Sequence, residues 1–156
     1  MKTLVAYFSA SGITASVAKE VASAANADLY EIKPGVRYTS ADLNWMDKKS
    51  RTSVEMSDKK FRPEIFNTDV QVDKYDEIIL GFPIWWYVSP TIINTFLESY
   101  DFSGKKIVLF ATSGGSGFGN TVSELKPSAP NAVIMEGKVF HKATKREIAE
   151  WVKSIS

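Results

Sequence analysis

The stretch T-L-V-A-Y-F-S-A-S-G-I-T at positions 3–14 decides how the rest of the sequence is interpreted. Its first six residues are apolar or β-favouring, so they predict a short buried strand. A polar turn follows at Ser9 to Gly12, and from Thr14 onward the apolar residues Val17 and Val21 recur at helical spacing. Strand, polar turn and helix in this order predict an α/β architecture.

The same alternation continues along the chain. Four further strands are predicted, each bounded by polar or glycine-containing turns, at 28–32, 76–82, 106–112 and 132–135. Helices are predicted between or after them from 14, from 90, over 120–125 and from 144. Five strands with interleaved helices indicate a single domain over residues 1–156, built on a parallel sheet with right-handed crossovers.

Two helix starts carry recognisable signals. Ser89 and Pro90 predict an N-cap followed by proline at the first helical position, and Thr144 and Glu147 have the spacing of a capping box. The apolar residues behind these starts should face the core, namely Ile92, Ile93, Phe96 and Leu97 in the first helix and Ile148, Trp151 and Val152 in the second.

Residues 34–74 form a long insertion between the second and third predicted strands. A helix is predicted within Leu43–Met56, and the rest should be irregular. A long loop in a compact domain is usually a lid or a binding surface. Its basic part, residues 37–62, has seven basic against four acidic side chains, which fits a solvated face, a site for the phosphate of NADPH or a docking surface. If the segment is a lid, Trp45 and Arg51 are the candidates to cover a ligand.

Composition excludes several classes of site. The chain has no cysteine and one histidine, His141, so disulfides, thiolate chemistry and multi-histidine metal sites are excluded. A net charge of +1 gives no reason to expect nucleic acid or a membrane surface as a partner. Met1 leads straight into a strand rather than a targeting segment, so we expect a cytoplasmic protein. His141 is expected to be structural or solvated.

The turn between the first strand and the first helix suits a phosphate group. Ser9, Ser11 and Thr14 offer hydroxyls, Gly12 leaves room, and the start of a helix offers unpaired N–H groups. The turn has no lysine, so it is not an ATP- or GTP-binding P-loop, and it lacks the glycine spacing of a dinucleotide site. A phosphomonoester held by neutral donors fits better. The alternative is a polar turn that only caps the helix.

Two more loops follow strands at the same edge of the predicted sheet. The first has three adjacent aromatic residues, Trp85, Trp86 and Tyr87, which cannot all face the core, so a flat π-rich ligand, a hydrophobic corner or a dimer contact would cover them. The second, residues 113–119, has four glycines that allow close approach to a ligand, or it is a flexible connector. Ligands of doubly wound sheets bind at this edge.

These three loops resemble those of the flavodoxin family, over residues 1–34 and 75–156. The resemblance implies a three-layer sandwich with a five-stranded parallel sheet of order 2-1-3-4-5, helices on both faces and FMN at the switch point. It implies phosphate binding by Ser9, Ser11, Gly12, Ile13, Thr14 and Ala15. It also implies ring binding by two loops, Pro83, Ile84, Trp85, Trp86 and Tyr87 in the first and Ser113, Gly114, Gly115, Ser116 and Gly119 in the second.

Two features depart from the family pattern. Low-potential flavodoxins are strongly acidic, whereas this chain is near neutral, so its bound flavin should have a less extreme potential. Members often have a glycine in the first flavin loop, where this chain has Trp86 and Tyr87, for which a glycine-like backbone would be strained.

Three functions are compatible with the sequence. The first is an electron carrier that docks on redox partner proteins. The second is an FMN-dependent NAD(P)H oxidoreductase of quinone-like acceptors, and the third is a non-redox FMN-binding role. In each case the flavin carries the chemistry and no side chain is expected to act as a catalytic acid or base.

Overall fold

The sheet is parallel and has five strands in the order 2-1-3-4-5 in the computed structural model, which describes residues 2–155. The strands are β1 (Thr3–Tyr7), β2 (Asp28–Glu31), β3 (Glu77–Pro83), β4 (Lys106–Thr112) and β5 (Val133–Phe140). This order places β1 and β3 side by side, with Leu4 opposite Ile78 and Ala6 opposite Leu80. The order expected from the family resemblance is therefore confirmed.

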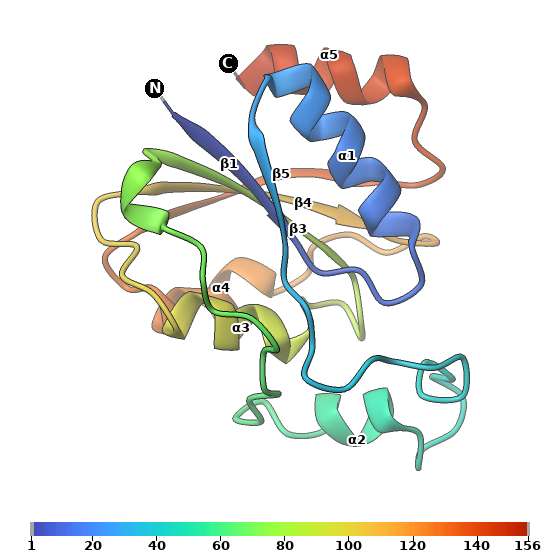
Figure 1. Ribbon diagram of the computed structural model, residues 1–156. Helices are drawn as coiled ribbons and strands as arrows, with labels where there is room; N and C mark the ends of the chain where they lie inside the picture. Colours follow the sequence, from blue (N-terminus) through green and yellow to red (C-terminus); the bar gives the residue numbers. More distant parts are fainter. Residues whose placement is uncertain (1, 156) are drawn as a thin grey trace.

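Helices cover both faces of the sheet (Figure 1). On one face lie α1 (Ile13–Ala25) and α5 (Lys145–Ile155), and on the other lie α3 (Thr91–Glu98) and α4 (Thr121–Leu125). Two short 3-10 turns, η1 (Val72–Lys74) and η2 (Lys126–Ser128), complete the connections. Each face has its own core because alternate residues of the central strands point to opposite sides. The expected apolar stripes of α3 and α5 are buried in these two cores.

One of the two predicted helix starts is different in the structure. Helix α3 begins at Thr91, with Pro90 at the N-cap position and no side chain capping it. Ser89 therefore precedes the N-cap position, and its hydroxyl accepts no hydrogen bond from the N–H groups of the helix. At the start of α5 the backbone N–H of Glu147 donates to Thr144 Oγ1 at 3.1 Å, as the capping signal predicts.

Strand β5 is longer than the four residues predicted from the sequence. A register shift between Leu109 and Phe110 leaves Gly137 as an extra residue opposite β4, and pairing continues to Phe140. A side chain at this bulge has no room, because a Cβ at Gly137 would lie 2.2 Å from the Leu109 carbonyl oxygen and 2.6 Å from Trp151. Glycine inside a strand often marks such a bulge.

The insertion folds away from the sheet beyond β2 (Figure 1). Its helix α2 (Arg51–Met56) has six residues and lies inside Leu43–Met56, so the prediction of a helix within that range is confirmed. Turns occupy 40–49, where Asp42, Asn44 and Asp47 side chains accept backbone N–H groups and favour turns over helix. An antiparallel bridge between Pro34 and Ile65 closes the insertion at its base.

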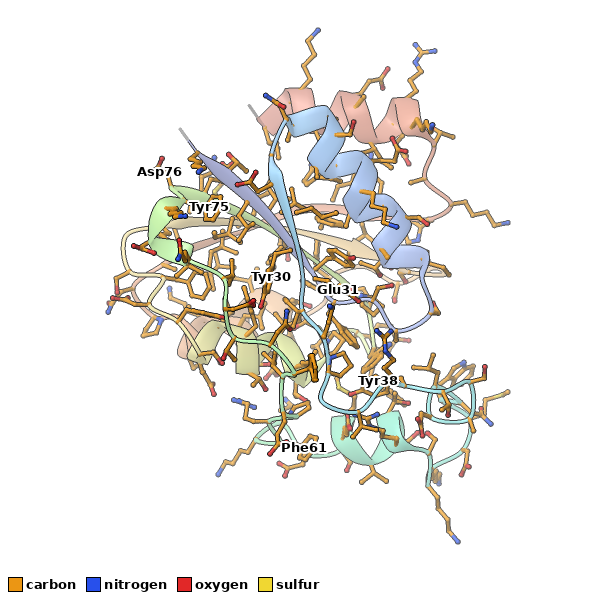
Figure 2. The ribbon with its side chains drawn as sticks, viewed as in Figure 1. Tyr30, Glu31, Tyr38, Phe61, Tyr75 and Asp76 are labelled. Carbon is orange, nitrogen blue, oxygen red and sulfur yellow. The ribbon has the colours of Figure 1, made fainter. Side chains whose placement is uncertain are left out.

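The return path of the insertion is held against β2. Tyr30 donates to the Asn67 carbonyl at 3.2 Å, and Tyr75 donates to the Asp28 carboxylate at 2.7 Å (Figure 2). Within the described residues 2–155, no helix is long and apolar enough to cross a membrane.

Candidate functional site

Three loops lie at the carboxyl edge of the sheet. They follow the three central strands, β1, β3 and β4. In that order they are the turn at 9–14 that suits a phosphate (the phosphate-like turn), the aromatic loop at 83–87 and the glycine-rich loop at 113–119. Parallel strands bring all three to one edge, where ligands of doubly wound folds bind.

The turn after β1 offers a row of unused backbone donors. Gly12 has φ 97° and caps α1 in a left-handed conformation, while its own N–H donates to Ser9 Oγ at 3.1 Å. Nothing in residues 2–155 accepts a hydrogen bond from the N–H groups of Ile13, Thr14 and Ala15. Such a row at the positive end of a helix is suited to an anion.

The hydroxyl groups of this turn have different roles. Ser11 is exposed and can reach a ligand, whereas Thr14 is buried and its Oγ1 lies 2.7 Å from Thr112 Oγ1 at the end of β4. This bond ties the phosphate-like turn to the strand that leads into the glycine-rich loop. The sequence indicated a ligand donor at Thr14, and the structure adds a positioning role for it.

Basic side chains lie closer to this turn than the sequence suggested. A small cavity of about 70 Å³ beside Ser9 and Ala10 is lined by Lys33, just before the insertion, and by Arg37 within it, together with Glu31. The sequence indicated neutral donors alone, because no base is adjacent to residues 9–15 in the chain. Only the fold brings the two cations to the turn.

A cavity of about 680 Å³ lies between the aromatic and glycine-rich loops. Its walls come from three separate parts of the chain and consist of Leu43, Trp45, Thr52, Ile84, Trp85, Trp86, Tyr87, Ser113, Gly114, Gly115 and Ser116. A mostly apolar, aromatic wall with a few polar groups is typical of a small-molecule site of this size. The predicted loop residues 84–87 and 113–116 are therefore brought together.

Trp85 is the half-buried member of the aromatic trio. Its ring packs edge-to-face against Phe8 at 5.6 Å and Tyr38 at 5.4 Å between centroids. This cluster joins the end of β1, the insertion and the aromatic loop. Trp86 and Tyr87 are 43% and 70% exposed, so they form the part of the wall that solvent reaches.

Trp86 and Tyr87 occupy a strained turn. Trp85 N–H donates to the Val88 carbonyl at 2.9 Å, Val88 N–H donates back at 3.2 Å, and the two residues between have φ of 51° and 65°. Positive φ at both central positions is the pattern of a type I′ turn, which favours asparagine and glycine. The sequence indicated that a glycine-like backbone would be strained here, and the structure holds that conformation nonetheless.

Relief of this strain is measurable. We expect Tyr87→Gly to raise the free energy of unfolding of the ligand-free protein by about 0.5–1 kcal/mol, because glycine adopts positive φ without the penalty of a side chain. Urea unfolding would check it.

Phe66→Gly is the matched control for that substitution. Phe66 is 73% exposed, similar to Tyr87, but its φ is not positive, so glycine there should lower stability by about 0.5–1 kcal/mol. Equal losses at both positions would contradict the strain at Tyr87.

The glycine-rich loop is held by its own serines. Ser113 Oγ accepts from the N–H groups of Gly115 and Ser116 at 3.2 and 2.9 Å, and it lies 2.8 Å from Ser116 Oγ. His141 Nδ1 lies 2.9 Å from the Ser113 carbonyl oxygen, so Nδ1 carries the proton of that bond. The expectation that His141 is structural is consistent with this contact.

Residues of the insertion were missed as wall residues by the sequence interpretation. Leu43 and Thr52 line the 680 Å³ cavity, and only the unusual length of the insertion hinted at this. Of the two residues considered for a lid, Trp45 lines the cavity and Arg51 does not. Arg51 instead binds within the insertion, where it stacks 3.7 Å from the Tyr38 ring and pairs with Glu55 at 2.8 Å.

Tyr38 is one of the residues through which the insertion packs against the core of the domain (Figure 2). Its ring packs on Phe8 and Trp85, and its hydroxyl donates to Glu55. Burial first, and then the hydrogen bond to Glu55, raises the pKa of the Tyr38 hydroxyl well above its usual range. Tyr38 therefore stays neutral at physiological pH and serves as a packed support behind Trp85.

Two of the residues predicted for the ring-binding loops lie outside the main cavity. Pro83 ends β3 opposite Thr112 and does not line the 680 Å³ cavity. Gly119 lines a neighbouring cavity on the other side of the Trp86–Tyr87 turn. Both are close to the site in sequence, and the turn separates Gly119 from the main cavity.

Comparisons with known proteins give matches over nearly the whole chain. The family model described as Flavodoxin matches residues 2–155. A candidate flavoprotein from Bacteroides uniformis ATCC 8492 is 49% identical, with a TM-score of 0.92 and 97% of each chain covered. One from Bacteroides eggerthii DSM 20697 is 46% identical, with a TM-score of 0.90 and coverage of 99% of this chain and 97% of that one.

A more distant structure shares the fold. It is a flavoprotein from Lactobacillus acidophilus NCFM solved in complex with FMN, 24% identical, with a TM-score of 0.71 and coverage of 96% of this chain and 97% of that one. No curated protein matches the sequence.

Proposed function

This chain belongs to the flavodoxin family of FMN-binding proteins, and on that premise we propose that it is an electron carrier acting through FMN at the carboxyl ends of β1, β3 and β4. One observation carries the proposal. The unused N–H row at Ile13–Ala15 lies at the same sheet edge as an aromatic-lined cavity of about 680 Å³. A phosphate and a flat ring system need these two environments together.

The residues present fit the cofactor. The N–H groups of Ile13, Thr14 and Ala15 and the hydroxyls of Ser9 and Ser11 would hold the phosphate. The walls at 84–87 and 113–116 would hold the ring, with Trp86 and Tyr87 keeping water from it. When bound, FMN supplies the capacity to accept and donate electrons.

The net charge of the chain affects the reduction potential expected for bound FMN. With a net charge of +1 the protein opposes added negative charge less than an acidic protein would, so it should favour a less extreme reduction potential. The exposed Trp86–Tyr87 edge is where a redox partner protein would dock. We further propose that this carrier works in the cytoplasm.

Flavin binding tests the proposal directly. Tryptophan fluorescence should be quenched in a saturable way at micromolar or lower FMN, because Trp85 and Trp86 line the cavity. Riboflavin, which lacks the phosphate, should bind at least ~100-fold more weakly, since two hydrogen bonds to a charged group contribute roughly 3 kcal/mol or more. Equal affinities for FMN and riboflavin would remove the phosphate assignment.

A pair of glycine variants locates the phosphate. Gly12 and Gly104 both have positive φ, 97° and 76°, and a Cβ at either meets nothing within 4 Å. Gly12→Ala should weaken FMN binding about tenfold, because alanine disfavours the turn that presents the N–H groups. Gly104→Ala should lower the free energy of unfolding by about as much as Gly12→Ala does, and it should leave FMN affinity unchanged. The reverse pattern would place the phosphate elsewhere.

A second candidate function is an FMN-dependent NAD(P)H oxidoreductase that reduces quinone-like acceptors. A groove of about 650 Å³ favours it, because this groove runs beside Trp86 and is lined by Trp45, Met46 and Lys48 among others, leaving room for a second planar molecule. NADPH consumption in the presence of a quinone separates the two, since a carrier should show almost none. A flavin that cannot be reduced in place would favour the non-redox role.

A further inference from the structure

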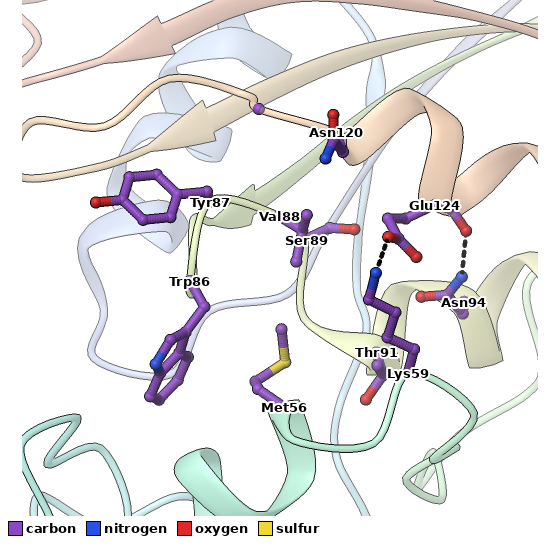
Figure 3. A pocket seen from close by; sticks show the side chains of 11 residues that line it. Met56, Lys59, Trp86, Tyr87, Val88, Ser89, Thr91, Asn94, Asn120 and Glu124 are labelled. Atoms are coloured by element: carbon purple, nitrogen blue, oxygen red, sulfur yellow. Dashed lines mark hydrogen bonds and ion pairs between the residues drawn. The ribbon is translucent and has the colours of Figure 1, made fainter.

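A second cavity, of about 320 Å³, lies behind the strained turn (Figure 3). Trp86 and Tyr87 form one wall and also line the main cavity, so the turn separates the two. The opposite walls come from the start of α3, from α4 and the residue before it, and from the end of α2 and the turn that follows it in the insertion. The lining residues are Met56, Lys59, Trp86, Tyr87, Val88, Ser89, Thr91, Asn94, Gly119, Asn120 and Glu124.

Two buried hydroxyl groups in this cavity have no partner. Three buried side-chain oxygens in residues 2–155 make no hydrogen bond, and two of them are Ser89 Oγ and Thr91 Oγ1. Ser89 is 3% exposed and Thr91 7%. A buried hydroxyl without a partner costs roughly 1–3 kcal/mol. Two of them at one small cavity indicate that a bound molecule supplies the missing hydrogen bonds.

The start of α3 adds further donors at the same place. The helix has eight residues and no side-chain cap, since Pro90 stands at the N-cap. No described residue accepts from the N–H groups of Thr91 and Ile92. The positive end of the helix dipole and these unused N–H groups therefore lie beside the two orphan hydroxyls.

A lysine lies across the cavity from these donors. Lys59 Nζ lies 2.9 Å from Glu124 Oε1 (Figure 3). The Lys59 side chain is 77% exposed, and its ammonium group has further N–H donors that can bind a ligand. Asn94 is engaged with the Glu124 backbone carbonyl and Ser128 and holds the helices together. The groups left for a ligand are mostly donors: two hydroxyls, two N–H groups and an ammonium group.

We propose that this cavity is a binding site for a small oxyanion, a phosphate or carboxylate group, held by Ser89, Thr91, the start of α3 and Lys59. Because its wall is the Trp86–Tyr87 turn, an occupant also contacts the residues that line the main cavity. The inference does not depend on FMN, since none of the donors belongs to residues 9–15.

Backbone amide NMR of ¹⁵N-labelled protein tests the site. Inorganic phosphate is titrated at constant ionic strength with chloride, and acetate is titrated in parallel. Saturable shifts are expected at Ser89, Thr91, Ile92 and the Trp86 indole. Shifts at Ile13–Ala15 report the phosphate-like turn separately, so failure of one site is distinguishable from failure of the other. The anion that saturates at lower concentration identifies the oxyanion class.

Two valine variants of α3 provide a matched comparison. Thr91→Val removes a cavity hydroxyl, whereas Thr95→Val, one turn later, removes a hydroxyl that bonds only to the Thr91 carbonyl at 3.4 Å. Thr91→Val should weaken binding about tenfold, the effect of one hydrogen bond to a charged group, and Ser89→Ala should add to the loss. Thr95→Val should leave the affinity unchanged.

Glu124→Gln should tighten anion binding several-fold, because it removes the negative charge beside Lys59. The proposal is overturned if phosphate and acetate give no saturable shifts at 89–92, which would mean that water alone fills the cavity. It is overturned equally if chloride gives the same shifts, or if the shifts persist in the Ser89→Ala/Thr91→Val double variant.

Discussion

Gly81→Ala is expected to lower the free energy of unfolding by about 3 kcal/mol or more, because the added methyl group overpacks the core. Gly81 lies in the middle of β3, and a Cβ there would be 2.0 Å from Phe110 Cζ and within 2.5 Å of both Cε atoms. Phe110 is fully buried and packs against Phe140 and Trp151, so its ring cannot move aside. Thermal unfolding should show a drop in Tm of roughly 10 °C.

Two controls isolate the clash at Gly81. Gly35→Ala adds the same methyl group where the nearest atom is 3.5 Å away, so it should change stability little. In the double variant Gly81→Ala/Phe110→Leu, the loss should be smaller than the sum of the two single losses, because leucine vacates the space that the ring fills. Additive losses would show that the Phe110 ring is not the cause.

Gly119→Ala is expected to weaken FMN binding by about tenfold or more and to lower stability by about 2 kcal/mol. A Cβ at Gly119 would lie 2.2 Å from the Tyr87 carbonyl oxygen and 3.2 Å from Tyr87 Cβ, and its φ of 54° is already left-handed. The added methyl group must push the strained turn away, and the turn forms the wall of both cavities. Flavin titration and urea unfolding of the same sample measure the two effects.

Gly117→Ala is the matched control for Gly119→Ala. It lies in the same loop, its φ is not positive, and a Cβ there meets nothing within 4 Å. We expect nearly unchanged FMN affinity and stability. If Gly117→Ala and Gly119→Ala behave alike, the loop tolerates or rejects side chains for a reason other than contact with Tyr87.

Close contacts link the three loops of the candidate site to one another. The aromatic loop and the glycine-rich loop touch through Gly119 and Tyr87, while Thr14 and Thr112 connect the first loop to β4. The three loops are therefore linked by close contacts before any ligand arrives. Such preorganisation reduces the ordering cost of binding.

The position of the site followed from local sequence signals. Apolar runs such as Thr3–Phe8 and Lys106–Thr112 predicted buried strands, and the polar and glycine-rich segments after them marked the ligand edge. These features depend on residues near each other in the chain, so they can be read without the fold. The loop residues 84–87 and 113–116 were identified in this way, and they do line one cavity.

Features that depend on distant residues were not predictable in the same way. Leu43 and Thr52 reach the cavity because the insertion folds back to the sheet edge, and Ser89 does not cap α3 because the helix begins at Thr91, with Pro90 at the N-cap. The left-handed Trp86 and Tyr87 oppose their own preferences, and the mutual bonds of Trp85 and Val88 hold them there.

Local pattern by itself determined the α/β class, most strand positions and the three ligand-suited loops of this protein, because these follow from the spacing of apolar and turn-forming residues within a few positions. Tertiary structure alone decided the strained turn, the second cavity behind it and the part played by the insertion. Those features arise where packing between segments far apart in the chain outweighs local preference.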